Sequence, residues 1–259
     1  MTTQVPSNAS VHVVMIAIGG ATCCGKTTLA KQLRKCLPDS IMIHQDDFFP
    51  PNQDNLPYNE ELKEYDWDNA ATAIDWPKFV ASLEHVKRTG RLPDGHTSWD
   101  NCNDVKEISA SDDVLNKWRN AFLGTEENYA KSTGKKLVWI VVEGFLLFWH
   151  QAIVDLLDAR IFLRAPRDII KERRLNRPVY YPAEGLDEAW VTYPAYWDQL
   201  VYPAYVRAHN DLFEAGDIEH GKLSGKIQGL LLLEPVEVDM SQMVDAICQH
   251  VLRAANEVM

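Results

Sequence analysis

The chain has 259 residues, of which 46% are apolar or aromatic and 24% are charged. This length fits one generous domain or two small ones, and the composition is ordinary for a globular protein. The excess of Asp and Glu gives a formal net charge of -11. Sequence-independent binding of nucleic acid needs a surface that neutralises phosphates, so the acidic balance argues against it. Any anionic ligand must therefore be held by a local site.

Several other classes of protein are also disfavoured. No apolar run approaches the ~20 residues of a membrane span, and residues 1–10 lack the basic-then-apolar layout of a signal peptide. The five cysteines form no C-x-x-C pair and no zinc spacing. We therefore expect a cytoplasmic protein with reduced thiols, no nucleic-acid or membrane partner and no obligate protein partner.

A phosphate-binding motif appears early in the chain. Residues 11–18 are a short, β-branched, largely apolar run, typical of a buried parallel strand. Gly20-x4-Gly25-Lys26-Thr27 follows and matches the P-loop pattern in full. Apolar residues at helical spacing come next and end at Pro38. The motif therefore lies in the strand–loop–helix context that a P-loop requires.

Each position of this motif has a physical reason. The glycines let the backbone turn tightly and direct N–H groups at phosphate oxygens, and the helix adds its positive end. Lys26 can reach the β- and γ-phosphates, and the Thr27 hydroxyl can bind Mg²⁺. The residues that we expect to hold the nucleotide phosphates are Gly20, Ala21, Thr22, Cys23, Cys24, Gly25, Lys26, Thr27 and Thr28.

A P-loop occurs in small-molecule kinases, in GTP-dependent switches, and in ATPase motors or regulatory modules. The sequence lacks the guanine-specifying N-K-x-D motif, since its one Asn-Lys, at 116–117, is followed by Trp118-Arg119. No surface typical of a motor stands out. A kinase additionally needs a carboxylate near the acceptor hydroxyl.

Candidate carboxylates follow the next expected strand, residues 40–44. Ligands of open α/β sheets lie beyond the carboxyl ends of the strands, where Asp46 and Asp47 fall. A carboxylate there can orient an attacking hydroxyl and accept its proton. Adjacent residues usually face different ways, so we expect one functional aspartate and one structural partner. We interpret His44 as a strand-end residue rather than a catalyst.

A third carboxylate, Glu143, closes another buried-strand run over residues 137–142. A charged residue at the end of such a run is costly to desolvate. Its position is that of a Walker-B acid, which holds Mg²⁺ directly or through water. The alternative is an edge residue exposed to solvent.

Positive charge gathers after a fourth expected strand, residues 159–163. On a helix, Arg173 and Arg177 share a face while Arg174 is turned away. That face could close over a triphosphate and stabilise the charge that develops during transfer. The alternative is a solvated helix face.

Together these residues resemble the nicotinamide riboside kinase family, which is grouped with uridine kinase and phosphoribulokinase. The resemblance covers about 15–87 and 137–213. Its specific strings are Gln-Asp-Asp-Phe-Phe at 45–49 and Glu-Gly-Phe-Leu-Leu-Phe at 143–148, and Tyr-Asp at 65–66 also contributes. It implies a Rossmann-like parallel sheet flanked by helices, with an arginine-bearing lid at about 167–186. It also implies ATP with Mg²⁺, and transfer of the γ-phosphate to a nucleoside 5′-hydroxyl.

The resemblance also assigns roles to residues. Asp46 would be the general base and a metal neighbour, with Thr27 and Glu143 on the metal side. Lys26 and Arg173 would assist transfer, and Arg177 would join Arg173 on the nucleotide. The residues that would bind the nucleoside are Asp46, Asp47, Phe48, Phe49, Tyr65, Asp66, Arg174 and Tyr180. Of these, Asp66 and Arg174 would hold the ribose hydroxyls. Tyr65 and a second tyrosine after the lid would stack on the two faces of the cationic nicotinamide ring.

The sequence departs from the family pattern in three places. Pro178 is an extra residue, so the second stacking tyrosine is Tyr180 or Tyr181, and we favour Tyr180. Residues 88–136 are longer than the family needs, and we expect one short amphipathic helix there with flexible flanks. The adenine pocket near 233–235 has no recognisable signature, which leaves ATP over GTP to the resemblance.

The rest of the chain predicts architecture. We expect helices over 75–88 and 194–213, the latter kinked at Pro203, then a last strand over 229–233 and a helix over 240–259. The whole chain is thus expected to be one P-loop kinase domain, residues 1–259, with an insert. A uridine kinase-like enzyme and a non-catalytic nucleotide-binding regulator remain the alternatives.

Overall fold

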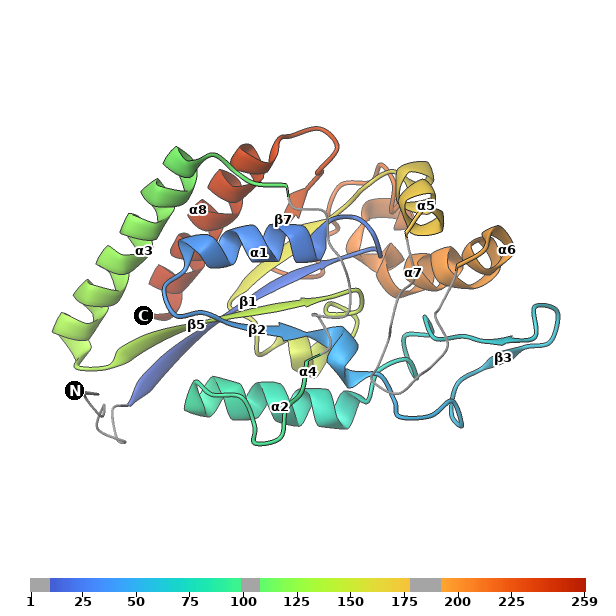
Figure 1. Cartoon of the computed structure of the whole chain (residues 1–259), viewed down its shortest axis with the longest axis horizontal. Helices are drawn as coiled ribbons and strands as arrows, with labels where there is room; N and C mark the ends of the chain where they lie inside the picture. Colours follow the sequence, from blue (N-terminus) through green and yellow to red (C-terminus); the bar gives the residue numbers. More distant parts are fainter. Residues whose placement is uncertain (1–9, 99–107, 178–191) are drawn as a thin grey trace.

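A five-stranded sheet forms the centre of the computed structural model, which describes residues 10–98, 108–177 and 192–259. Every neighbouring pair of its strands is parallel, in the order β2-β5-β1-β6-β7 (Figure 1). The strands are β1 (Val11–Gly20), β2 (Ile41–His44), β5 (Lys136–Gly144), β6 (Ala159–Leu163) and β7 (Leu230–Leu233). The predicted α/β fold with a parallel sheet is confirmed.

Helices cover both faces of this sheet. They are α1 (Lys26–Cys36), α2 (Trp76–Thr89), α3 (Asp112–Thr133), α4 (Gln151–Val154), α5 (Arg167–Leu175), α6 (Pro194–Tyr196), α7 (Tyr202–His209) and α8 (Met240–Val258). Short 3₁₀ turns are η1 (Gln45–Phe48), η4 (Asn210–Leu212) and η5 (Glu214–Gly216), and a small hairpin is formed by β3 (Tyr58–Asn59) and β4 (Glu64–Tyr65). Within the described ranges no helix is long and apolar enough to cross a lipid bilayer.

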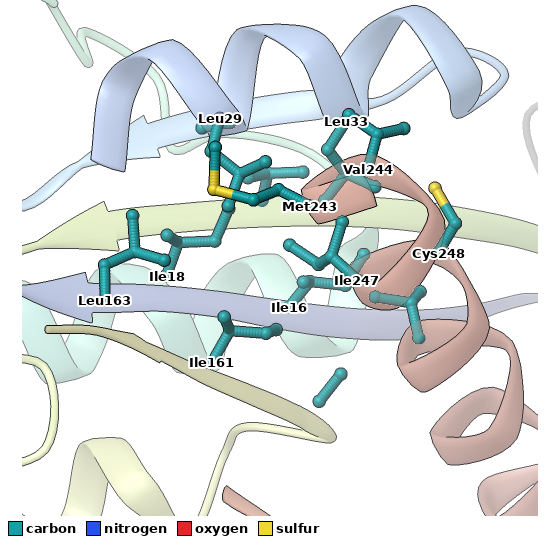
Figure 2. Packing of buried hydrophobic residues seen from close by; sticks show 14 of the residues in the cluster. Ile16, Ile18, Leu29, Leu33, Ile161, Leu163, Met243, Val244, Ile247 and Cys248 are labelled. Atoms are coloured by element: carbon teal, nitrogen blue, oxygen red, sulfur yellow. The ribbon is translucent and has the colours of Figure 1, made fainter. Parts of the chain in front are cut away.

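The central strand β1 divides the core into two layers because successive side chains of a strand point to opposite faces. Val14, Ile16 and Ile18 are buried beneath α1, α3 and α8, and Figure 2 shows this layer with Leu29 above and Met243 beside it. The alternate residues, 13, 15 and 17, are buried in the layer that includes α2 and α4. This two-sided burial explains why β1 is apolar throughout.

The ends of the helices follow local sequence signals. The Asp75 side chain accepts a hydrogen bond from the Lys78 N–H at 3.1 Å at the start of α2, and Gly90 ends that helix at φ 65. At the start of α8, Asp239 and Gln242 form a reciprocal capping box.

The expected helix over 194–213 is continuous through residue 209 but contains a π-helical turn. It consists of α6, a π-helical turn η3 (Trp197–Val201), α7 and the turn η4. Proline has no N–H to donate to the preceding turn, so a wider turn just before Pro203, which lies in the first turn of α7, is expected physically.

The insert contains a longer helix than we expected. The predicted short helix is a 22-residue helix, α3, which ends at Gly134. It packs against α1 and α8, and Phe122 is fully buried with its ring centroid 5.0 Å from that of Trp139 on β5. Tertiary packing thus extends the helix well beyond its strongest apolar stretch. Part of the expected flanks, residues 99–107, lies outside the described residues.

We predict that Phe122→Ala lowers the free energy of unfolding by about 3–5 kcal/mol, because it leaves a cavity between α3 and the sheet. Urea unfolding followed by circular dichroism measures this. Leu123→Ala is the matched control: its side chain is 37% exposed, so the change should be within about 0.5 kcal/mol. Equal effects of the two substitutions would contradict the role given to α3.

Candidate active site

The loop between β1 and α1 has the backbone geometry of a phosphate cradle. Gly20 has φ 140 and Gly25 has φ 105, a region that side chains disfavour. A Cβ atom on Gly20 would lie 2.3 Å from the carbonyl oxygen of Leu163. Only glycine fits there, which lets the loop pass close to the neighbouring strand β6.

The first two residues of α1 face different parts of the site. The Lys26 Nζ donates a hydrogen bond to the Ala21 carbonyl oxygen at 2.9 Å, so its ammonium group lies over its own loop. The Thr27 hydroxyl lies near the carboxylate of Glu143, the penultimate residue of β5, and helps to lower the pKa of that carboxylate. The P-loop and the end of β5 are therefore joined at the point where the metal site is expected.

Glu143 is held as a carboxylate. Burial raises its pKa, but the hydrogen bond from His44 and the charge of Lys26 outweigh burial and leave the pKa below its ordinary value. The His44 Nδ1 and the Glu143 Oε1 are 2.8 Å apart, and both residues are buried. Mg²⁺ is usually held by one or two carboxylates together with phosphate oxygens, and a Thr27–Glu143 pair beside a P-loop fits that requirement.

The two sequence strings that characterise the family interlock at the ends of β2 and β5. The Gln45 side-chain oxygen accepts a hydrogen bond from the Leu146 N–H at 2.8 Å. A Cβ atom on Gly144 would lie 2.4 Å from the Cβ of Gln45, so this glycine permits the close approach. The interlock places Asp46, the next residue of η1, at the same edge of the sheet as Glu143.

The neighbours of Asp46 turn away from that edge. The Asp47 carboxylate is almost fully buried and lies 3.5 Å from the His96 Nε2, which favours the interpretation of Asp47 as the structural partner. Phe48 is buried in the core with its ring centroid 4.7 Å from that of Phe79. Phe49 is partly exposed, beside Phe145 at 6.0 Å, and is better placed than Phe48 to meet a ligand.

The hairpin β3–β4 carries Tyr65 and Asp66. Tyr65 is partly exposed, and its carbonyl oxygen accepts a hydrogen bond from the Tyr196 hydroxyl at 3.4 Å. Asp66 is buried, with its Oδ2 3.8 Å from Arg207. Burial raises the pKa of Asp66 above its ordinary value.

A further carboxylate, Asp68, lies between these groups. Burial, together with the nearby carboxylates of Asp66 and Asp46, raises the pKa of Asp68 to about 6 against the opposing charge of Arg174. Asp68 lines a small hollow beside the P-loop. The other residues around this hollow are Ala21, Thr22, Phe145, Leu146, Trp197, Val201, Tyr202 and Tyr205.

Two arginines of α5 reach the P-loop. An Arg173 Nη1 lies 3.4 Å from the Cys23 carbonyl oxygen, and the Arg174 Nη1 donates to the Thr22 hydroxyl at 3.2 Å. The prediction that Arg174 is turned away is therefore wrong. The prediction that Arg173 and Arg177 share a helical face is also wrong, because α5 ends at Leu175 and Arg177 follows the helix.

Some predicted positions remain to be placed. Cys24 is buried, whereas Cys23 and Thr28 are partly exposed. Tyr180 and the part of the expected lid from residue 178 onwards lie outside the described residues.

Known proteins show where this chain belongs. It is 30% identical over 213 residues to the nicotinamide riboside kinase of Saccharomyces cerevisiae, covering 81% of this chain and 83% of that protein. It is 29% identical over 236 residues to the nicotinamide riboside kinase of Eremothecium gossypii, covering 90% and 92%. The chain belongs to the nicotinamide riboside kinase family.

The match extends to more distant members of this family. Human nicotinamide riboside kinase 2 is 27% identical over 219 residues, covering 82% of this chain and 74% of that protein. No protein-family profile matches the chain. A sugar kinase of known structure from Janibacter sp. HTCC2649 covers 95% of this chain and 98% of its own at 12% identity, but its TM-score of 0.40 is too low to bear on the fold.

Three residues of the candidate site were not predicted from the sequence. The sequence predicted His44 as a strand-end residue, and it did not single out Asp68 or Arg207. Only the first left a usable signal: His44 and Glu143 each close an apolar strand run, and such ends meet at one edge of a parallel sheet.

Because the folded pKa of Asp68 is about 6 and the model-peptide value is 3.8, the folded chain binds more protons than the unfolded chain between these values. Stability contributed at this position is therefore lost as pH rises from about 4 to about 6. We predict that Asp68→Asn removes this dependence on pH. The difference in free energy of unfolding between the variant and the wild type should therefore change by up to about 3 kcal/mol between about pH 4 and pH 6.

Denaturant unfolding at pH 4, 5, 6 and 7 measures the effect. Asp54→Asn, an exposed residue of the same region, is the control and should track the wild type. If the free energies of unfolding of Asp68→Asn and the wild type differ by the same amount at all four pH values, the raised pKa of Asp68 is contradicted.

Proposed function

We propose that this chain is a kinase that transfers the γ-phosphate of ATP, with Mg²⁺, to the 5′-hydroxyl of nicotinamide riboside and so forms nicotinamide mononucleotide. Membership of the family supports the reaction. The observation that supports this substrate is the arrangement beside the P-loop, where three carboxylates, Asp46, Asp66 and Asp68, lie near one another and near the partly exposed Tyr65. Such a site suits a cationic nucleoside. A cytoplasmic location is part of the proposal.

On the nucleotide side, the P-loop N–H groups and Lys26 bind the phosphates. Arg173, already at the loop, lies where it can contact the triphosphate, and we assign Arg177 to the same task. Thr27 and Glu143, with Asp46 near them, would hold Mg²⁺, which neutralises charge on the phosphates during transfer. Thr27 already contacts Glu143, which supports this set.

On the acceptor side, Asp46 accepts the proton of the 5′-hydroxyl while the hydroxyl oxygen forms its bond to the γ-phosphorus. The bond between the γ-phosphorus and the bridging oxygen breaks, and ADP leaves with the electron pair. Asp46 is suited to this role by its place at the edge of the sheet that carries the P-loop and Glu143. Asp66 and Arg174 would bind the ribose hydroxyls.

Recognition of the base is assigned to aromatic faces. A π-face attracts a cation, and a neutral pyrimidine gains less from it. Tyr65 supplies one face, and Tyr180 is proposed for the other. Asp68 adds negative charge on the same side of the P-loop, which favours a positively charged ring over a neutral one.

The direct test is a panel of nucleosides with ATP and Mg²⁺, following product by chromatography. We predict turnover of nicotinamide riboside with kcat/KM well above that of uridine. Preference for uridine would favour the uridine kinase-like alternative. Turnover of no nucleoside would favour a nucleotide-binding regulator.

We predict that Asp46→Asn lowers kcat by about 100-fold to 10,000-fold, because the general base is lost, while ATP binding measured by calorimetry stays near the wild-type value. Asp47→Asn is the comparison and should lose far less, since that carboxylate faces His96. A larger loss in Asp47→Asn than in Asp46→Asn would reassign the base.

A further inference from the structure

Two strand ends meet at the metal side of the site in a way that the proposed reaction does not yet use. His44 is the last residue of β2 and lies directly opposite Glu143 of β5 in the parallel register. Aligned residues of neighbouring strands project to the same face of a sheet, so the two side chains meet there. Both are buried, and the Nδ1–Oε1 separation of 2.8 Å is that of a charge-assisted hydrogen bond.

The surrounding contacts hold this pair in place. The next residue, Gln45, is fastened to the Leu146 N–H, which prevents β2 from sliding along β5. On the α1 side, the Thr27 hydroxyl lies near the Glu143 carboxylate. The carboxylate is thus oriented from both sides, by β2 and by α1.

The hydrogen bond also determines the state of the imidazole. A carboxylate accepts hydrogen bonds only, so Nδ1 must carry a hydrogen. With Oε1 engaged by His44, the orientation of the carboxylate about its last bond is set. Partners of this kind, one step removed from a metal, typically change metal affinity or activity by about 10-fold to 100-fold when they are removed.

We infer that His44 is a positioning residue: its Nδ1–H holds the Glu143 carboxylate in the orientation that binds the nucleotide-associated Mg²⁺. This rests on the proposed function only in assigning Glu143 to the metal. The inference does not depend on which nucleoside is the acceptor. It depends on a hydrogen bond and not on a change of charge at His44.

The test measures metal binding without turnover. Mn²⁺ is titrated into the full-length protein with ADP, and free Mn²⁺ is followed by electron paramagnetic resonance. We expect His44→Leu, which has no donor, to weaken Mn²⁺ binding by about 10-fold to 100-fold. His44→Asn, whose side-chain N–H₂ can replace the Nδ1–H, should stay near wild type.

Controls separate this role from general destabilisation. Trp139→Phe removes another side-chain hydrogen bond of β5, the partly buried one from its Nε1 to Glu126 at 2.7 Å, and should leave Mn²⁺ binding unchanged. Thermal unfolding shows that each variant is folded. If His44 acts through Glu143, His44→Leu should add little further weakening in a Glu143→Gln background, as a double-mutant cycle requires.

Three results would overturn the inference: wild-type Mn²⁺ affinity in His44→Leu, equal losses in His44→Leu and His44→Asn, or full additivity with Glu143→Gln. Because no acceptor is present, these results are independent of the nucleoside panel. If nicotinamide riboside is not phosphorylated in the nucleoside panel, it is rejected as the substrate, and the inferred role of His44 is unaffected.

Discussion

The main-chain pairing of β5 between β1 and β2 is the interaction on which the candidate active site depends. Because the three strands are parallel, their carboxyl ends open at one edge of the sheet. The P-loop leaves β1 there, Glu143 lies at the end of β5, and Asp46 follows β2. A slip of one residue would turn Glu143 to the opposite face, away from Thr27 and His44. The chemistry therefore depends on strand register.

Acidic side chains gather beside the P-loop at this edge. The P-loop presents N–H groups and Lys26, with Arg174 beside them, and Asp46, Asp66 and Asp68 lie near one another, with Arg207 close to Asp66 and Arg174 close to Asp68. This arrangement of charge suits the proposed transfer from an anionic donor to a cationic acceptor. A net charge of -11 does not reveal it, since the arrangement involves a few side chains brought together by folding.

The long helix α3 supports the nucleotide side from a distance. Ala110, just before α3, donates its N–H to the Gln32 side chain of α1 at 3.3 Å, and the Trp118 Nε1 donates to Asp245 of α8 at 2.9 Å. The insert therefore fastens together two helices that cover the same face of the sheet. The first of them begins at Lys26, so α3 packs against the helix that carries the P-loop lysine.

The sequence by itself determined the strand–loop–helix unit at 11–36, the positions of the apolar strands along the chain and the resemblance to the family. It also placed the carboxylate of Glu143 at the end of a buried strand. Each of these signals is carried by a few adjacent residues, through glycine spacing or an unbroken apolar run. Only the tertiary structure decided the pairing of His44 with Glu143, the place of Asp68 beside Arg174, and the end of α5 at Leu175. These features depend on contacts between residues about a hundred positions apart or on packing that outweighs helix propensity, and a local pattern does not encode either.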